Sequence, residues 1–236
     1  MGLFPPDAGL RIAMVAGEAS GDMLGARLID AIRARRPDAR FVGIGGPKMQ
    51  AAGLESLFPQ ETLAVRGYVE VLRNLRAILA IRRELKAKLL AERPDVFIGV
   101  DAPDFNLAVE HSLKAAGIRT IHYVSPSIWA WRGERVHKIK QAVNRVLALF
   151  PMEPPIYQAA GVPVSYVGHP LAESMPIVPD RQGAREVLNI LPRQAPVFTL
   201  MPGSRQGEVD VMAPLFIAAA RLIAKEVPDA QFLVPL

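Results

Sequence analysis

Cysteine does not occur among the 236 residues of the chain. Its absence excludes disulfide bonds, thiolate metal ligands and a cysteine nucleophile, and it fits a reducing compartment. Uncharged runs of the roughly 18 residues that span a bilayer are also missing, so we expect no transmembrane helix. No basic residue precedes Arg11 and position 6 is proline, which argues against a secretory leader and against N-myristoylation. We therefore expect a cytoplasmic protein that is soluble or bound to a membrane surface.

Acidic residues are scarce in the segment where basic residues gather. The net charge is +5, and eight basic against three acidic residues between Arg66 and Arg93 account for all of it. The rest of the chain is neutral, so a general nucleic-acid-binding surface is not indicated.

The same segment carries an apolar stripe of helical period, which predicts a helix over residues 68–90. The stripe consists of Tyr68, Leu72, Leu75, Ile78, Leu79, Ile81, Leu85 and Leu89. One interpretation is a helix packed on a sheet, with its basic face in solvent. The other is a surface that meets anionic lipid. Its candidate residues are Tyr68, Leu72, Arg73, Leu75, Arg76, Ile78 and Leu79.

Short apolar runs that alternate with helical patterns predict an α/β fold with a parallel sheet covered on both faces. The expected strands are residues 11–16, 41–46, 96–100, 120–124, 146–150 and 164–167. Ligands bind at the carboxyl ends of such strands. We therefore expect segments 17–22, 45–48, 101–104 and 125–131 to lie together beyond the carboxyl ends of the strands, a region that we call the rim.

A domain boundary is predicted near residues 168–180, where prolines interrupt the pattern. It divides the chain into a Rossmann-like domain, 1–172, and the beginning of a second one, 173–236. The second part shows a short helix at 182–191, a strand at 197–201, a helix at 209–225 and a strand at 231–236. One such unit cannot bury both faces of a sheet, so we expect this domain to continue beyond Leu236.

Two loops between a strand and a helix could bind phosphate. In the first, Gly17, Glu18, Ser20, Gly21 and Asp22 could bring backbone close to a ligand, or Ser20 or Asp22 could simply cap the helix. Its spacing differs from the dinucleotide fingerprint, so NAD is not indicated.

The second loop contains Gly203, Ser204 and Arg205, which suit a diphosphate because Arg engages phosphate oxygens bidentately. The alternative is a turn with a solvated arginine.

Asp101 and Asp104 follow an apolar strand. A partly desolvated carboxylate there could act as a general base, whereas Asp104 could instead cap a helix starting near Asn106. The pair is not an Asp-x-Asp motif and no histidine cluster accompanies it, so we expect neither a metal nor a cofactor.

The four histidines differ in their surroundings. His111 and His137 are expected at the surface, His122 in the core, and His169 at the domain junction. A further candidate group could line an acceptor pocket, although tryptophan more commonly serves core packing. That group is Ser125, Ser127, Trp129 and Trp131.

Taken together, these motifs resemble the lipid-A-disaccharide synthase family of bacterial glycosyltransferases. The matching strings are VAGEASGD at 15–22, DVFIGVDAPDFN at 95–106, HYVSPSIWAW at 122–131, GH at 168–169 and PGSR at 202–205. The resemblance implies a GT-B fold whose first half binds the acceptor and whose second half binds the nucleotide sugar. Members of the family continue well beyond position 236.

The resemblance also implies a reaction. UDP-2,3-diacylglucosamine and 2,3-diacylglucosamine 1-phosphate would give, with inversion, a β-1,6-linked disaccharide and UDP, at the cytoplasmic face of the inner membrane. Asp104 would be the base, with Asp101 beside it, and Arg205 would stabilise the leaving UDP. Ser20, Gly21 and Asp22 would shape the floor of the cleft, and His169 would lie between the domains.

Two alternatives remain open at the level of sequence. A UDP-sugar epimerase can share the fold, although it would not explain an apolar surface for acyl chains. A module that binds acceptor lipid or membrane without activity is the other alternative.

Overall fold

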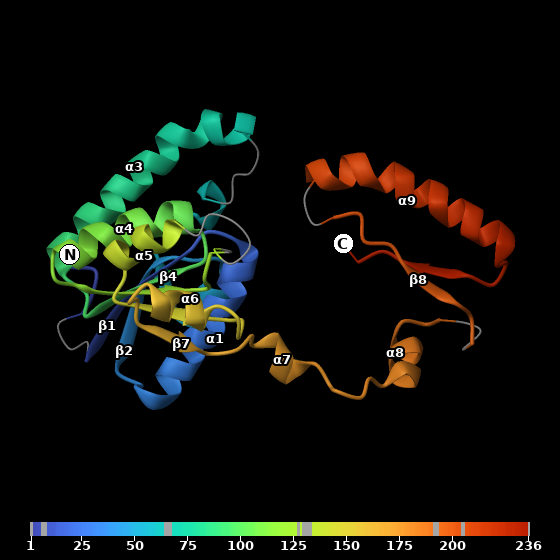
Figure 1. Cartoon of the computed structure of the whole chain (residues 1–236), viewed down its shortest axis with the longest axis horizontal. Helices are drawn as coiled ribbons and strands as arrows, with labels where there is room; N and C mark the ends of the chain where they lie inside the picture. Colours follow the sequence, from blue (N-terminus) through green and yellow to red (C-terminus); the bar gives the residue numbers. More distant parts are fainter. Residues whose placement is uncertain are drawn as a thin grey trace. The chain divides into compact units, whose positions relative to one another are not determined.

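The computed structural model describes residues 2–5, 9–63, 68–126, 128, 134–190, 194–203 and 206–235. The chain divides into two compact units, Met1–Ser174 and Met175–Leu236. Figure 1 traces both units along the chain. The assignment of acceptor binding to the first unit and nucleotide-sugar binding to the second stays a prediction.

The first unit is built on a seven-stranded parallel sheet in the order β3-β2-β1-β4-β5-β6-β7. The strands are β1 (Leu10–Ala16), β2 (Ala39–Ile44), β3 (Leu54–Ser56), β4 (Val96–Val100), β5 (Arg119–Tyr123), β6 (Arg145–Ala148) and β7 (Val164–Tyr166). Since every strand runs the same way, the loops that follow β1, β2, β4 and β5 leave the sheet at one edge. The expected α/β class with a parallel sheet is confirmed.

Helices cover both faces of this sheet because β1, β2 and β4 are apolar on both sides. On one face α1 (Ala19–Arg35) and α2 (Pro47–Ala51) pack through residues such as Ile29 and Met49. On the other face α3 (Tyr68–Glu92) and α4 (Pro103–Ala115) pack through Leu85, Leu89 and Val109. Figure 1 shows α3 and α4 on the side of the sheet opposite α1.

Smaller elements complete the first unit. The connections include the 3₁₀ helix η1 (Gln60–Thr62), α5 (Arg135–Ala142), α6 (Pro154–Ala159) and α7 (Leu171–Ser174). Residues of α5, β6 and α6 form a third apolar cluster, in which Ile139, Val146 and Tyr157 are fully buried.

The second unit contains α8 (Arg181–Val187), β8 (Val197–Thr199), α9 (Gln206–Glu226) and β9 (Gln231–Leu233). β8 and β9 pair in parallel as a two-stranded sheet. The predicted strand–helix–strand pattern is confirmed, with α8 ending several residues earlier than expected.

Candidate functional site

Strained backbone marks the carboxyl ends of two neighbouring strands. Asp101 and Ala102 follow β4 with φ of 52° and 44°, and Val124 follows β5 with φ of 79°. Non-glycine residues rarely adopt this left-handed conformation, which costs of order 1–3 kcal/mol each and clusters at functional sites. The Asp101 N–H donates to the carbonyl of Tyr123 at 2.8 Å, which joins the two loops. The strained backbone in these two loops therefore indicates a functional site at the carboxyl ends of β4 and β5.

The loop after β1 lies directly against the Asp101 turn. A Cβ added to Gly17 would lie 2.9 Å from the Cβ of Ala102, so only glycine allows this approach. The Asn106 side-chain amide donates to the carbonyl of Val15 at 3.2 Å and to that of Asp101 at 2.7 Å. Segments more than 80 residues apart are thereby held together at one rim.

Gln60 holds the other side of the Gly17 loop. Its amide group donates to the carbonyls of Ala16 and Glu18, both at 3.0 Å. Gln60 is not recognisable in the sequence as a site residue, because its partners are main-chain carbonyls 42 and 44 residues away and it belongs to no motif.

The interpretation of Ser20 or Asp22 as a helix cap is wrong, because α1 begins at Ala19 and its N-cap is Glu18. Ser20 is exposed at the rim, while Gly21 and Asp22 are buried. The Asp22 carboxylate accepts from the backbone N–H groups of Lys48 and Met49 at 3.0 and 2.9 Å. Asp22 therefore fixes the start of α2, which carries the loop after β2 into the same rim.

Asp104 does not cap α4 either, because that helix begins at Pro103 with Ala102 as its N-cap. Asp104 lies in the first turn, its side chain is 90% exposed, and its carboxylate is 3.4 Å from the guanidinium of Arg135. Asp101 is half-buried. In the described part of the chain, the Asp101 carboxylate has no hydrogen-bond partner. The two aspartates thus occupy different surroundings.

Ser125 lies in the interior rather than on the rim. Its hydroxyl is 2.7 Å from that of Tyr157, and it also donates to the carbonyl of Pro126. Burial raises the pKa of Tyr157 to about 12, so its hydroxyl stays protonated at neutral pH. Ser127, Trp129 and Trp131 lie outside the described residues.

His169 lies near the end of the first unit, where its Nδ1 accepts from the N–H of Leu171 at 3.2 Å. Its ring centroid is 6.5 Å from that of Phe150. The neighbouring carbonyl of Pro170 accepts from Arg27 of α1 at 2.9 Å, which ties this segment to the first unit. In the second unit, Gly203 has φ of 132°, and Ser204 and Arg205 are not among the described residues.

A buried pair of a histidine and a glutamate side chain lies beneath the rim. His122 is in the core as expected, and its Nδ1 is 2.8 Å from Oε1 of Glu110, with both side chains fully buried. Burial alone lowers the pKa of His122, but the charge and hydrogen bond of Glu110, followed by the charge of Asp101, raise this pKa above its ordinary value. Glu110 was missed from the sequence because its partner is on another element.

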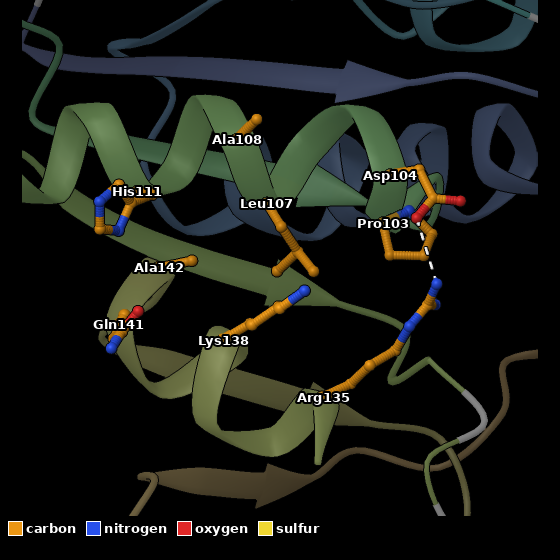
Figure 2. A pocket seen from close by; sticks show the side chains of 9 residues that line it. All are labelled: Pro103, Asp104, Leu107, Ala108, His111, Arg135, Lys138, Gln141 and Ala142. Carbon is orange, nitrogen blue, oxygen red and sulfur yellow. Dashed lines mark hydrogen bonds and ion pairs between the residues drawn. The ribbon is translucent and has the colours of Figure 1, made fainter. Parts of the chain in front are cut away.

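A groove of about 430 Å³ runs between α4 and α5. Figure 2 shows Asp104 and Arg135 at one end and His111, exposed as expected, toward the other. The described residues hold no cluster of three or more His, Asp or Glu side chains that could bind a metal ion.

The architecture around this rim is that of the GT-B class of glycosyltransferases and epimerases. A UDP-GlcNAc 2-epimerase from Neisseria meningitidis matches 96% of this chain and 65% of its own, with a TM-score of 0.58 and 11% identity. The glycotransferase of kitacinnamycin matches 94% of this chain and 65% of its own, with a TM-score of 0.51 and 17% identity. At these identities the likeness establishes the fold.

The chain belongs to the lipid-A-disaccharide synthetase family, whose model matches residues 12–236. A lipid-A-disaccharide synthase of Chromobacterium violaceum is 62% identical over 99% of this chain and 60% of its own length. Those of Dechloromonas aromatica and Neisseria meningitidis serogroup A are 60% and 59% identical over 96% and 95% of this chain. The chain spans about 60% of the length of these relatives.

Proposed function

We propose that this chain carries the acceptor-binding part, and the beginning of the donor-binding part, of an inverting glycosyltransferase. The enzyme transfers 2,3-diacylglucosamine from its UDP derivative to 2,3-diacylglucosamine 1-phosphate, giving lipid A disaccharide 1-phosphate and UDP. Family membership over residues 12–236 supports this assignment. The observation that carries it is the strained Asp101 turn at a rim where three loops converge.

The reaction is a single displacement with one proton transfer. The acceptor 6-hydroxyl oxygen attacks the anomeric carbon of the donor while the bond from that carbon to the UDP oxygen breaks. The configuration inverts, and the hydroxyl proton passes to a carboxylate acting as general base. A base beside the acceptor 6-hydroxyl is therefore required.

Asp101 suits this role better than Asp104, to which the family resemblance had assigned the base. Asp101 is half-buried on a strained turn, without a described partner for its carboxylate. Asp104 is 90% exposed and faces Arg135. Because Asp101 is partly removed from solvent and its backbone is held in place, its carboxylate has a defined position. We therefore assign the proton transfer to Asp101 and the positioning of the acceptor to Asp104.

The donor diphosphate is assigned to the loop between β8 and α9. In this proposal Arg205, with backbone groups at Gly203 and Ser204, stabilises the charge that develops on UDP. Glu18 and Ser20, together with Ser127, Trp129 and Trp131, contribute to the acceptor site, and His169 contributes from the end of the acceptor half. The start of α9 after Gly203 supports this assignment, because a helix N-terminus favours anions.

The enzyme works at the cytoplasmic face of the inner membrane in this proposal, since both substrates carry acyl chains. None of the helices in the described part of the chain combines the length and apolarity needed to cross a membrane. Leu75 and Leu79, which are exposed on α3, supply a candidate surface for anionic lipid.

The test uses the protein extended to the length of its relatives. Asp101→Asn should lower kcat by about 10²–10⁴-fold, and Asp104→Asn by less than about tenfold. Disaccharide formation from radiolabelled acceptor measures both variants. If Asp101→Asn keeps the wild-type rate, the assignment of the base is refuted.

An epimerase is the rival activity within the same fold. Incubation of the extended protein with UDP-N-acetylglucosamine, followed by separation of the C2 epimers, distinguishes the two. Turnover of that sugar without acyl chains would contradict the synthase assignment. Lipid binding without any product would support a non-catalytic module.

A further inference from the structure

We propose that the groove between α4 and α5 binds the phosphate monoester of a sugar 1-phosphate. The inference rests on the proposed function, because the acceptor named there carries such a group. The groove is lined by Pro103, Asp104, Leu107, Ala108, His111, Arg135, Lys138, Gln141 and Ala142.

Cations gather at the end of the groove that lies next to the rim. Arg135 and Lys138 of α5 point into it, as Figure 2 shows, and Arg82 of α3 donates to the main-chain carbonyl of Asp104 at 3.4 Å. Asp104 is the single acidic residue among the described lining residues. This excess of positive charge attracts an anion.

The existing ion pair leaves Arg135 available to a ligand. Its guanidinium is 3.4 Å from the Asp104 carboxylate, and Asp104 is almost fully exposed. An exposed pair at this distance contributes about 0–1 kcal/mol, so a dianionic phosphate can replace or share it. Arg135 can then bind two phosphate oxygens, with Lys138 as a second point charge.

The N-termini of α4 and α5 add to the positive electrostatic potential at this end of the groove. α4 begins at Pro103 and α5 at Arg135, and each follows a parallel strand, so both start at the carboxyl edge of the sheet. The positive ends of both helix dipoles therefore lie where Arg135 and Asp104 meet. This end of the groove is favourable for the charged part of the ligand.

The rest of the groove suits the less polar part of a sugar phosphate. Leu107, Ala108 and Ala142 provide an apolar floor, and His111 and Gln141 offer hydrogen-bonding groups farther along. Asp104 and His111 are seven residues apart on one helix, which corresponds to about 10 Å. Asp101 precedes Pro103, the first lining residue, by two residues, so the end of the groove that would hold the phosphate follows the proposed base closely along the chain.

The test measures binding of glucosamine 1-phosphate, inorganic phosphate and phosphatidylglycerol vesicles to the 236-residue chain. We expect the sugar phosphate to shift the amide NMR signals of α5 and the start of α4. Arg135→Gln/Lys138→Gln should weaken this binding about tenfold or more, because two charge-assisted contacts are lost. Lys140→Gln/Arg145→Gln is the matched control, since it removes two charges that lie outside the groove lining.

If both double variants lost the same affinity for the sugar phosphate, the loss would be explained by net charge alone, and the proposal would be overturned. Equal affinity for inorganic phosphate would contradict a site for a sugar phosphate, and binding of vesicles alone would assign the groove to lipid headgroups instead. None of these outcomes depends on glycosyl transfer. The groove proposal can therefore be refuted while the assignment of Asp101 as the base stands. The assignment of Asp101 can likewise be refuted while the groove proposal stands.

Discussion

Asn106, Glu110 and His122 form a fully buried polar group directly beneath the Asp101 turn. Three of their atoms, Oδ1 of Asn106, Oε2 of Glu110 and Nε2 of His122, have no hydrogen-bond partner among the described residues. A Cβ at Gly99 would overlap the Glu110 carboxylate, so glycine makes room for the pair. Buried charge is costly unless it is paired, which makes each member dependent on the other.

Glu110→Gln should change the protonation of His122. In the wild type the raised pKa of His122 means that protonation stabilises the fold below about pH 6.5, and this contribution is lost as pH rises through the folded-state pKa. Without the Glu110 charge, burial dominates and lowers the pKa. We expect the variant to be about 1–3 kcal/mol less stable near pH 6, with the difference shrinking at higher pH.

Urea unfolding between pH 5.5 and 8.5, together with NMR titration of the His122 ring, measures both effects. His111→Gln is the control, because His111 is exposed and contacts neither Glu110 nor Asp101 in the described structure. A stability difference independent of pH would mean that His122 does not carry the proton.

At the residue scale, the site residues that occur in sequence motifs were predicted. Those whose role depends on a hydrogen-bond partner far away in the chain were not. Asp101 and Gly17 follow strand ends, and a strand-end residue is recognisable without a structure. Gln60 and Glu110 lie in segments without a motif, and their partners are 12 to 44 residues away. The wrong caps at Ser20, Asp22 and Asp104 come from placing helix starts a few residues too late.

At the scale of single elements, α3 shows two kinds of apolar residue on one helix. Leu85 and Leu89 are fully buried, and Ile78 and Ile81 pack beside them on the core. Leu75 and Leu79 are 40% and 42% exposed, with the exposed Arg76 beside them. The side chains of Tyr68, Leu72 and Arg73 lie outside the described part. The two interpretations of the stripe therefore apply to different residues of the same helix.

Leu75→Ser/Leu79→Ser should weaken binding to vesicles that contain anionic lipid by about tenfold, which corresponds to about 1.4 kcal/mol. The fold should be unaffected because both side chains are already exposed. Co-sedimentation measures binding, and circular dichroism checks the fold. Leu90→Ser is the control, since Leu90 lies on the same helix, is 38% exposed, and is outside the candidate surface. Equal losses in both variants would exclude a specific surface.

Element boundaries show why short structures escape sequence analysis. The six strands expected in the first unit are all present, because runs of apolar residues fix them. β3 was missed, since three residues carry no recognisable period. α6 was also not predicted; it begins with two prolines, which are well accommodated in the first turn of a helix.

At the scale of the whole molecule, buried apolar surface is distributed unevenly between the two units. The three clusters formed by described residues lie entirely within the first unit. In the second unit the buried apolar residues that the structure describes are Ile190, Ala195 and Pro202, while Val211, Leu215 and Leu222 of α9 are exposed. Since hydrophobic burial is the main stabilising contribution, the first unit should hold most of the folding free energy.

A chain ending at Ser174 should therefore unfold cooperatively, with a thermal midpoint within about 3 °C of the main transition of the 236-residue chain. Residues 175–236 alone should show no cooperative transition, because a unit of this size with so few buried apolar side chains cannot offset its conformational entropy. Circular dichroism melts of the three chains measure this. A midpoint more than about 10 °C lower for the shortened chain would show that the second unit stabilises the first, and that the apolar clusters alone do not determine the stability of the sheet.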